Sequence, residues 1–303
     1  MAAVLDKEDG FIQECTPLYP WREKLEEPLE ATHTVRRIFT EPQTLGYPTN
    51  RPRSYCIGVS NRSLVWVGPS QADVQQDFLS IFGRQRIANA DVYLNADDNE
   101  INEELRQFAV RQRNFWPPNY DAAEAIRQGA DILAECLFPG AYNRMLSWEL
   151  QRVRKGLADQ VFLADCDHNA NKGPAAGPCY PTELSHSCVI AHHLKRPATK
   201  WETLSSHGWH THASVAGAYG VSPMIGLLKS ANLKDRELAS LGGNGMHIPT
   251  VWAVYMYMLM NTVWRSDVTP SVSEVKLGQR GGTVFFEEFT ETQVDEEECE
   301  DME

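Results

Sequence analysis

The sequence lacks the cysteine patterns that build disulfide-rich or zinc-bound folds. Its seven cysteines are odd in number and include no Cys-X-X-Cys pair, so neither a zinc ribbon nor a disulfide framework is expected. This usage is typical of a reduced, intracellular compartment. The first ten residues, MAAVLDKEDG, have no basic region followed by an apolar core, and we therefore expect no signal peptide.

Two further absences narrow the functional classes. The uncharged stretch 246–264 approaches the length of a membrane span, but His247 and Pro249 interrupt it. We therefore expect a buried helix over 249–264 and no membrane partner. No standard zinc spacing occurs either, so we expect no metal site, although seven potential ligands gather in one region. These are Cys166, His168, Cys179, His186, Cys188, His192 and His193.

Positive charge is scarce, with 28 Lys and Arg against 41 Asp and Glu and a formal net charge of -13. Residues 285–303 contain ten acids and no Lys or Arg, which leaves about -3 for the rest of the chain. We expect residues 267–303 to form an acidic, disordered tail. Contact with DNA then requires a local basic surface. Arg113 and Arg154, near the ends of two predicted helices, are candidate DNA-binding residues of such a surface, with ordinary solvated helix charges as the alternative.

The stretch LGYPTNRPRSYCIGV, residues 45–59, combines a turn, two arginines and a strand. Pro52 fixes the backbone between Arg51 and Arg53, and residues 54–59 are typical of a buried strand. Side chains at i and i+2 of a strand point the same way, so the two guanidiniums are aimed together. Such a pair suits a phosphate, a carboxylate or the edge of a base. Two solvated surface arginines are the alternative.

This stretch resembles motif VIII of the cytosine-5 DNA methyltransferases, in which two arginines spaced by one residue precede a strand. Thr49 stands where the family has glutamine. The run RPATKWETLSSHGW, residues 196–209, resembles motif IX, with His207 in place of a glutamine. Locally, Thr199 and Glu202 form a capping box that begins a helix, and Gly208 can close this helix in a left-handed conformation. Residues 241–249, LGGNGMHIP, look like motif X, a Gly-Asn turn before an apolar helix.

The resemblance implies roles for individual residues. Arg51 and Arg53 are expected to be catalytic, steadying the flipped cytosine and its phosphate. Asn244 and Gly245 are expected to lie beside S-adenosyl-L-methionine. Arg196 and Thr199 are expected to contribute to DNA binding by organising the target-recognition region. DNA is the partner that the family implies, with a nuclear location in a eukaryote, although some relatives of this fold methylate transfer RNA.

The residues that perform the family's chemistry are missing from this sequence. It has no Pro-Cys-Gln, no Glu-Asn-Val and no strand followed by a glycine-rich cofactor loop. Pro178-Cys179 follows the paired arginines instead of preceding them, so Cys179 is not expected to be the nucleophile. About forty-five residues precede the motif VIII stretch, too few for the βαβ units of a donor-binding fold. The chain then resembles half of a methyltransferase.

Three hypotheses follow from the missing half. The chain is one subunit of a split enzyme, a non-catalytic remnant that binds DNA or acts as a scaffold, or the truncated product of a longer gene. In the first and third cases a second chain or a longer chain would complete the donor site, and only then would S-adenosyl-L-methionine be its cofactor.

The expected fold class is α/β: a partial S-adenosylmethionine-dependent methyltransferase sheet of mixed strand direction, with the helix near Val251 packed against it, and a mainly helical target-recognition insert. Strands are expected over 32–39, 54–59, 63–67 and 161–163, and helices over 97–111, 122–137, 141–157, 233–239 and 249–264. The expected division is an irregular lead-in at 1–31, the edge of a catalytic domain at 32–68, a recognition-like region at 69–189, the motif IX and X region at 190–266, and the tail at 267–303.

Overall fold

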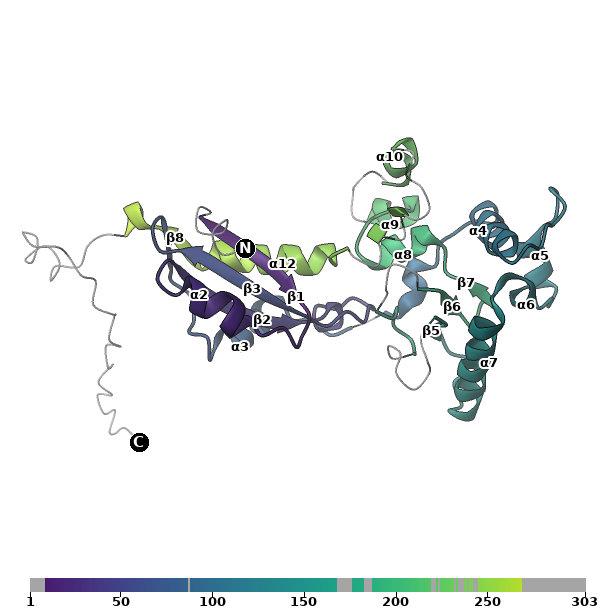
Figure 1. Ribbon diagram of the computed structural model, residues 1–303, viewed down its shortest axis with the longest axis horizontal. Helices are drawn as coiled ribbons and strands as arrows, with labels where there is room; N and C mark the ends of the chain where they lie inside the picture. The colour runs from purple at the N-terminus through teal and green to yellow at the C-terminus, as the bar shows by residue number, and fades with distance from the viewer. Residues whose placement is uncertain are drawn as a thin grey trace, which may run out of the picture.

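A computed structural model describes residues 9–86, 88–167, 176–182, 187–218, 222, 224–231, 233, 237–238, 240–241 and 245–268. Helices and strands are mixed, and the strands form small antiparallel sheets. The described part is elongated: one sheet with α12 (Ile248–Met260) lies at one end, and a largely helical region lies at the other (Figure 1). None of the helices in the described segments is long and apolar enough to cross a membrane.

The first sheet has the order β1-β3-β2 and is antiparallel throughout. Its strands are β1 (Gly10–Cys15), β2 (His33–Thr40) and β3 (Arg53–Ser60). The predicted strands at 32–39 and 54–59 are confirmed, but the mixed strand direction that we expected is wrong. The irregular lead-in is also wrong, because β1 lies within it and is followed by η1 (Arg22–Glu26) and α2 (Glu27–Leu29).

The two faces of this sheet are covered by different elements. On one face, α12 and α3 (Val74–Phe82) form a core with side chains of β2 and β3. On the other face, η1 and α2 pack through Trp21, Leu25 and Leu29. The expected packing of the helix near Val251 on the sheet is therefore confirmed. The predicted strand at 63–67 is β4 (Leu64–Trp66), but it pairs with β8 (Thr262–Trp264), so the helix predicted to reach residue 264 ends at Met260.

The second region contains helices and a small antiparallel sheet of order β5-β6-β7. Its helices are η3 (Ala90–Tyr93), α4 (Asp98–Arg111), α5 (Ala122–Arg127), α6 (Leu133–Cys136) and α7 (Pro139–Arg154). Its strands are β5 (Leu163–Asp165), β6 (Val189–Ala191) and β7 (Arg196–Pro197). The long helix predicted at 122–137 is two helices, because the chain turns at Gly129, where φ is +90°.

Three short helices precede α12: α8 (Lys200–Ser206), α9 (Ala213–Ala218) and α10 (Ile225–Ser230). Two single turns also lie in the described part of the chain, η2 (Pro42–Thr44) and η4 (Arg265–Asp267). The helix predicted at 233–239 is only partly covered, and residues 269–303 of the predicted tail lie outside the described residues.

Candidate active site at the paired arginines

Three segments that are distant in sequence meet at one end of the first sheet. Thr49 donates its hydroxyl hydrogen to the carbonyl of Ser206 (3.0 Å). The Ile248 amide donates to the carbonyl of His207 (2.9 Å), and Arg51 Nη2 donates to the carbonyl of Gly245 (2.5 Å). The structure thus brings together residues 49–51, 206–207 and 245–248, one segment from each of the stretches that resemble motifs VIII, IX and X.

Glu14 is a residue of this site to which the sequence analysis assigned no role. It lies on β1 opposite Tyr55 of β3. Its Oε1 is 2.9 Å from Arg53 Nε and 3.9 Å from Arg51 Nε. The Arg51 side chain is only 4% exposed, so this is not a pair of solvated surface arginines. Burial raises the pKa of the Glu14 carboxyl, and the two arginines oppose this shift.

Two histidines stand beside Arg51. Burial, and secondarily the charge of Arg51, lowers the pKa of His247 to about 3 and that of His207 well below its ordinary value. Both rings are therefore neutral near pH 7. His247 also caps α12, because its Nδ1 accepts a hydrogen bond from the Thr250 amide (3.3 Å). Neutrality keeps that ring nitrogen available as an acceptor.

Gly208 explains how the segment after α8 can approach α12. Its φ is +84°, a conformation that glycine adopts without strain. A Cβ at this position would lie 2.3 Å from Pro249 Cδ. The prediction that Gly208 closes this helix in a left-handed conformation is confirmed. His207 occupies the C-cap of α8, between the helix and this turn.

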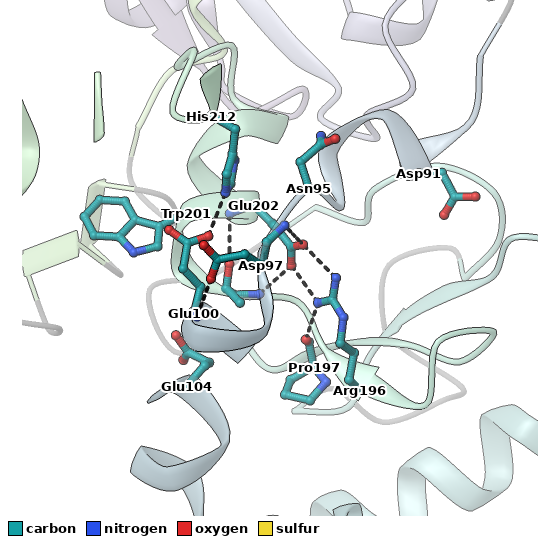
Figure 2. A network of polar contacts seen from close by, with 12 residues as sticks. Asp91, Asn95, Asp97, Glu100, Glu104, Arg196, Pro197, Trp201, Glu202 and His212 are labelled. Atoms are coloured by element: carbon teal, nitrogen blue, oxygen red, sulfur yellow. Dashed lines mark hydrogen bonds and ion pairs between the residues drawn. The ribbon is translucent and has the colours of Figure 1, made fainter. Parts of the chain in front are cut away.

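The predicted capping box at the start of α8 is confirmed and belongs to a larger buried network (Figure 2). Arg196 donates to both carboxylate oxygens of Glu202, at 2.8 and 2.7 Å. Glu202 is fully buried and also accepts hydrogen bonds from the amides of Thr199 (2.8 Å) and Ala96 (3.0 Å). Arg196 and Thr199 are thus buried in a network that joins β7, α8 and the segment before α4. Both side chains are buried, so they organise this part of the fold, and their predicted contribution to DNA binding stays a prediction.

The other two candidate DNA-binding residues, Arg113 and Arg154, are exposed and lie near opposite ends of α7. Arg113 follows α4 with φ of +61°, next to Asn114, which bonds the carbonyl of Glu135 just before α7. Arg154 ends α7, and a helix of this length separates its two ends by roughly 22 Å. Arg152 is buried and pairs with Glu149. The roles of Arg113 and Arg154 in DNA binding, or as ordinary solvated helix charges, stay predictions.

Three further positions from the sequence analysis remain: the expected donor-side pair Asn244 and Gly245, and Cys179. Asn244 lies outside the described residues, whereas Gly245 is placed beside Arg51. Cys179 is buried, and Arg86 Nη1 lies 3.2 Å from its sulfur. Burial raises the pKa of the Cys179 thiol, which keeps it in the protonated, poorly nucleophilic form.

The arginine site contains two guanidiniums and one nearby carboxylate, Glu14, so these three groups carry a net positive charge when ionised. That arrangement can attract an anion or hold the polar edge of a base. The two arginines lie at the start of β3 and in the turn just before it, and the Glu14 carboxylate lies on the neighbouring strand β1. In comparisons with known proteins, no family model and no curated protein matches this chain.

Proposed function

We propose that this chain is the recognition half of a cytosine-5 DNA methyltransferase. It is inactive alone, and its nucleophile and donor site come from a second chain or from a longer form of the same chain. The observation that supports this proposal is the meeting of the three motif-like segments at Arg51. Independent surface segments have no reason to converge on one buried arginine.

Each group of the site has a part in this chemistry. Methylation of cytosine at C5 requires a thiolate that attacks C6, an acid that protonates N3 and a methyl donor. Arg51 and Arg53 steady the flipped cytosine and its phosphate. Burial raises the pKa of the Glu14 carboxyl against the opposing charge of both arginines, and this makes Glu14 the candidate in this chain for the acid that protonates N3. An acid that the sequence analysis assigned to the missing half therefore has a candidate in this chain.

The thiolate and the methyl donor have no such candidates here. Cys179 is protonated and buried, as described above. Of the expected donor-side pair, Gly245 is the described member, and its carbonyl already accepts a hydrogen bond from Arg51. Within the described ranges the chain thus offers a border to a donor pocket and no complete pocket, so S-adenosyl-L-methionine would be a cofactor of the completed enzyme.

The test is a methyl transfer assay with two polypeptides. The full chain is co-expressed with the catalytic half of a cytosine-5 methyltransferase, cut before its own paired-arginine motif. Transfer of tritium from labelled S-adenosyl-L-methionine to DNA is then measured. We expect transfer by the co-purified pair, none by either chain alone, and at least a hundredfold loss in the Arg53→Ala pair.

A matched variant separates the arginine site from folding. Arg127→Ala removes an exposed arginine that is paired on the surface with Asp98 and Glu124, and it should leave transfer unchanged. A pair that co-purifies, remains folded and transfers no methyl group would refute the split-enzyme proposal. Methyl transfer by the chain alone would refute the proposal that its nucleophile and donor site come from a second chain or a longer form.

A second candidate function is supported by the contact between Glu14 and both arginines. If that carboxylate occupies the guanidiniums permanently, the chain is a non-catalytic, DNA-binding or scaffolding remnant of the same family. Glu14→Gln separates the two functions. The remnant gains DNA affinity in this variant, because an anion is removed, whereas the enzyme loses methyl transfer, because its acid is removed.

A further inference from the structure

The two edges of the β1-β3-β2 sheet differ in how their backbone groups are satisfied. Along β2, the side chain of Gln71 accepts from the Arg37 amide (2.7 Å) and donates to its carbonyl (3.1 Å), and Gln75 accepts from the Phe39 amide (2.8 Å). The outer edge of β1 has no strand and no side chain bonded to its backbone within the described part of the chain. An open edge of this kind is a template for another strand.

An apolar groove runs beside this open edge. It has a volume of about 340 Å³ and lies between Phe11 and Ile12 of β1 and Val251, Trp252 and Tyr255 of α12. The exposed surface continues along α12 to β8, where Trp264 is 53% exposed; Trp252 is 57% exposed and Tyr255 is 38% exposed.

The exposed apolar area is large for a surface with no partner. Taking the usual area of a full aromatic side chain, these three residues alone expose roughly 300 Å². Met256, Leu259 and Met260 are also exposed on the helix and enlarge this area. A stable interface needs on the order of 800 Å² from each partner, and the open strand and the groove supply further contact area.

Charge indicates which partner fits this surface. The chain carries a net charge of -13, of which about -3 lies outside residues 285–303, so two copies repel one another overall. Residues 246–264 and Gly10–Gln13 contain no charged side chain. Two copies of the chain can therefore meet on this surface without bringing like charges together.

We propose that the β1 edge and the exposed face of α12 form an interface with a second copy of this chain. Two β1 strands pair antiparallel about a two-fold axis and join two three-stranded sheets into one of six strands. A register centred on Ile12, whose backbone groups face the open edge, sets Glu14 opposite Gly10 of the other copy, so the two acids do not face each other. Trp252 and Tyr255 of each copy pack over the joined strands. This inference does not depend on the proposed enzymatic function.

Sedimentation velocity of the full chain over a range of concentrations tests the interface. We expect a reversible dimer, and a roughly tenfold or larger rise in its dissociation constant in Trp252→Glu. Phe115→Glu is the matched control, because Phe115 is 78% exposed but lies in the helical region, and it should leave dimerisation unchanged. Circular dichroism checks that both variants are folded.

Hydrogen exchange supplies a second readout that does not depend on a substitution. The β1 amides that do not bond to β3 should exchange more slowly at concentrations that favour the dimer. A chain that stays monomeric throughout the range overturns the proposal and leaves the surface to a different protein. A dimer that Trp252→Glu does not weaken, or one without added protection of β1, also overturns it.

Discussion

Two buried arginine sites differ in how their charge is balanced. At Arg196, one guanidinium meets one carboxylate through two hydrogen bonds, and Glu202 accepts two more from backbone amides. At the other site, Arg51 and Arg53 share the single carboxylate of Glu14. The first site is neutral and joins elements of the fold. The second carries excess positive charge at the junction of three segments. That difference supports a structural role for Arg196 and the ligand-binding role that we propose for Arg51 and Arg53.

Removing the charge of Glu202 should have the largest effect on stability. Glu202→Gln leaves the Arg196 guanidinium buried without a counter-charge, which costs about 3–5 kcal/mol of unfolding free energy. Urea denaturation followed by circular dichroism measures the loss. Glu14→Gln is the matched variant at the second site and should cost clearly less, because Arg51 also donates to the carbonyl of Gly245 and the side chains of Arg53 and Glu14 are partly exposed. Equal losses at the two sites would contradict the division into a structural and a binding site.

Lowering the pH should reduce the stability of the fold, because the histidines beside Arg51 are buried in their neutral form. The pKa of His247 is about 3 in the folded protein and 6.5 when unperturbed, so the unfolded state binds more protons between these values. Stability is therefore complete above the unperturbed pKa and falls as the pH drops. For one buried neutral histidine, the loss from about pH 7.5 to about pH 5 is about 2 kcal/mol.

The His247→Asn variant isolates this effect. Asparagine keeps a side-chain acceptor for the Thr250 amide at the start of α12 but does not titrate. Urea unfolding at several pH values should show a smaller loss of stability on acidification in the variant than in the unaltered chain. An identical pH dependence would mean that His247 is not held neutral by its burial.

The smallest effects are expected at the exposed arginines. Arg113→Ala and Arg154→Ala should each weaken DNA binding slightly and reduce the slope of log K against log salt by about 1, if each meets one phosphate. Fluorescence anisotropy with labelled duplex DNA measures both. Arg127→Ala is the control, because its guanidinium is already paired with two surface carboxylates. Unchanged binding in both variants would exclude these residues from a DNA surface.

The parts of the structure that were predicted from sequence depend on local signals. A threonine three residues before a glutamate predicts the start of α8, and Gly208 predicts its end, because capping geometry is set within one helical turn. The strand after Arg53 and the helices α4 and α7 follow from the spacing of apolar residues. These signals do not depend on what the segment later contacts.

The parts that were missed depend on contacts between distant residues. The strand β1 forms because it pairs with β3, which lies about forty residues later in the chain. Its own sequence, GFIQEC, contains no local signal that predicts this pairing. Glu14 was missed for this reason, because a single glutamate becomes a site residue only when two arginines face it. The burial of Arg196 could have been inferred, since a capping-box glutamate lies six residues after it, but its exact partner required the fold.

The most direct test of the central claim is a calorimetric titration of the purified chain alone with S-adenosylhomocysteine. We predict no heat of binding from a chain shown to be folded, because in the proposed split enzyme the donor pocket is completed by a second chain or by a longer form of this one. Saturable binding with a stoichiometry near one would contradict the account, since it would mean that a donor site exists within the chain itself.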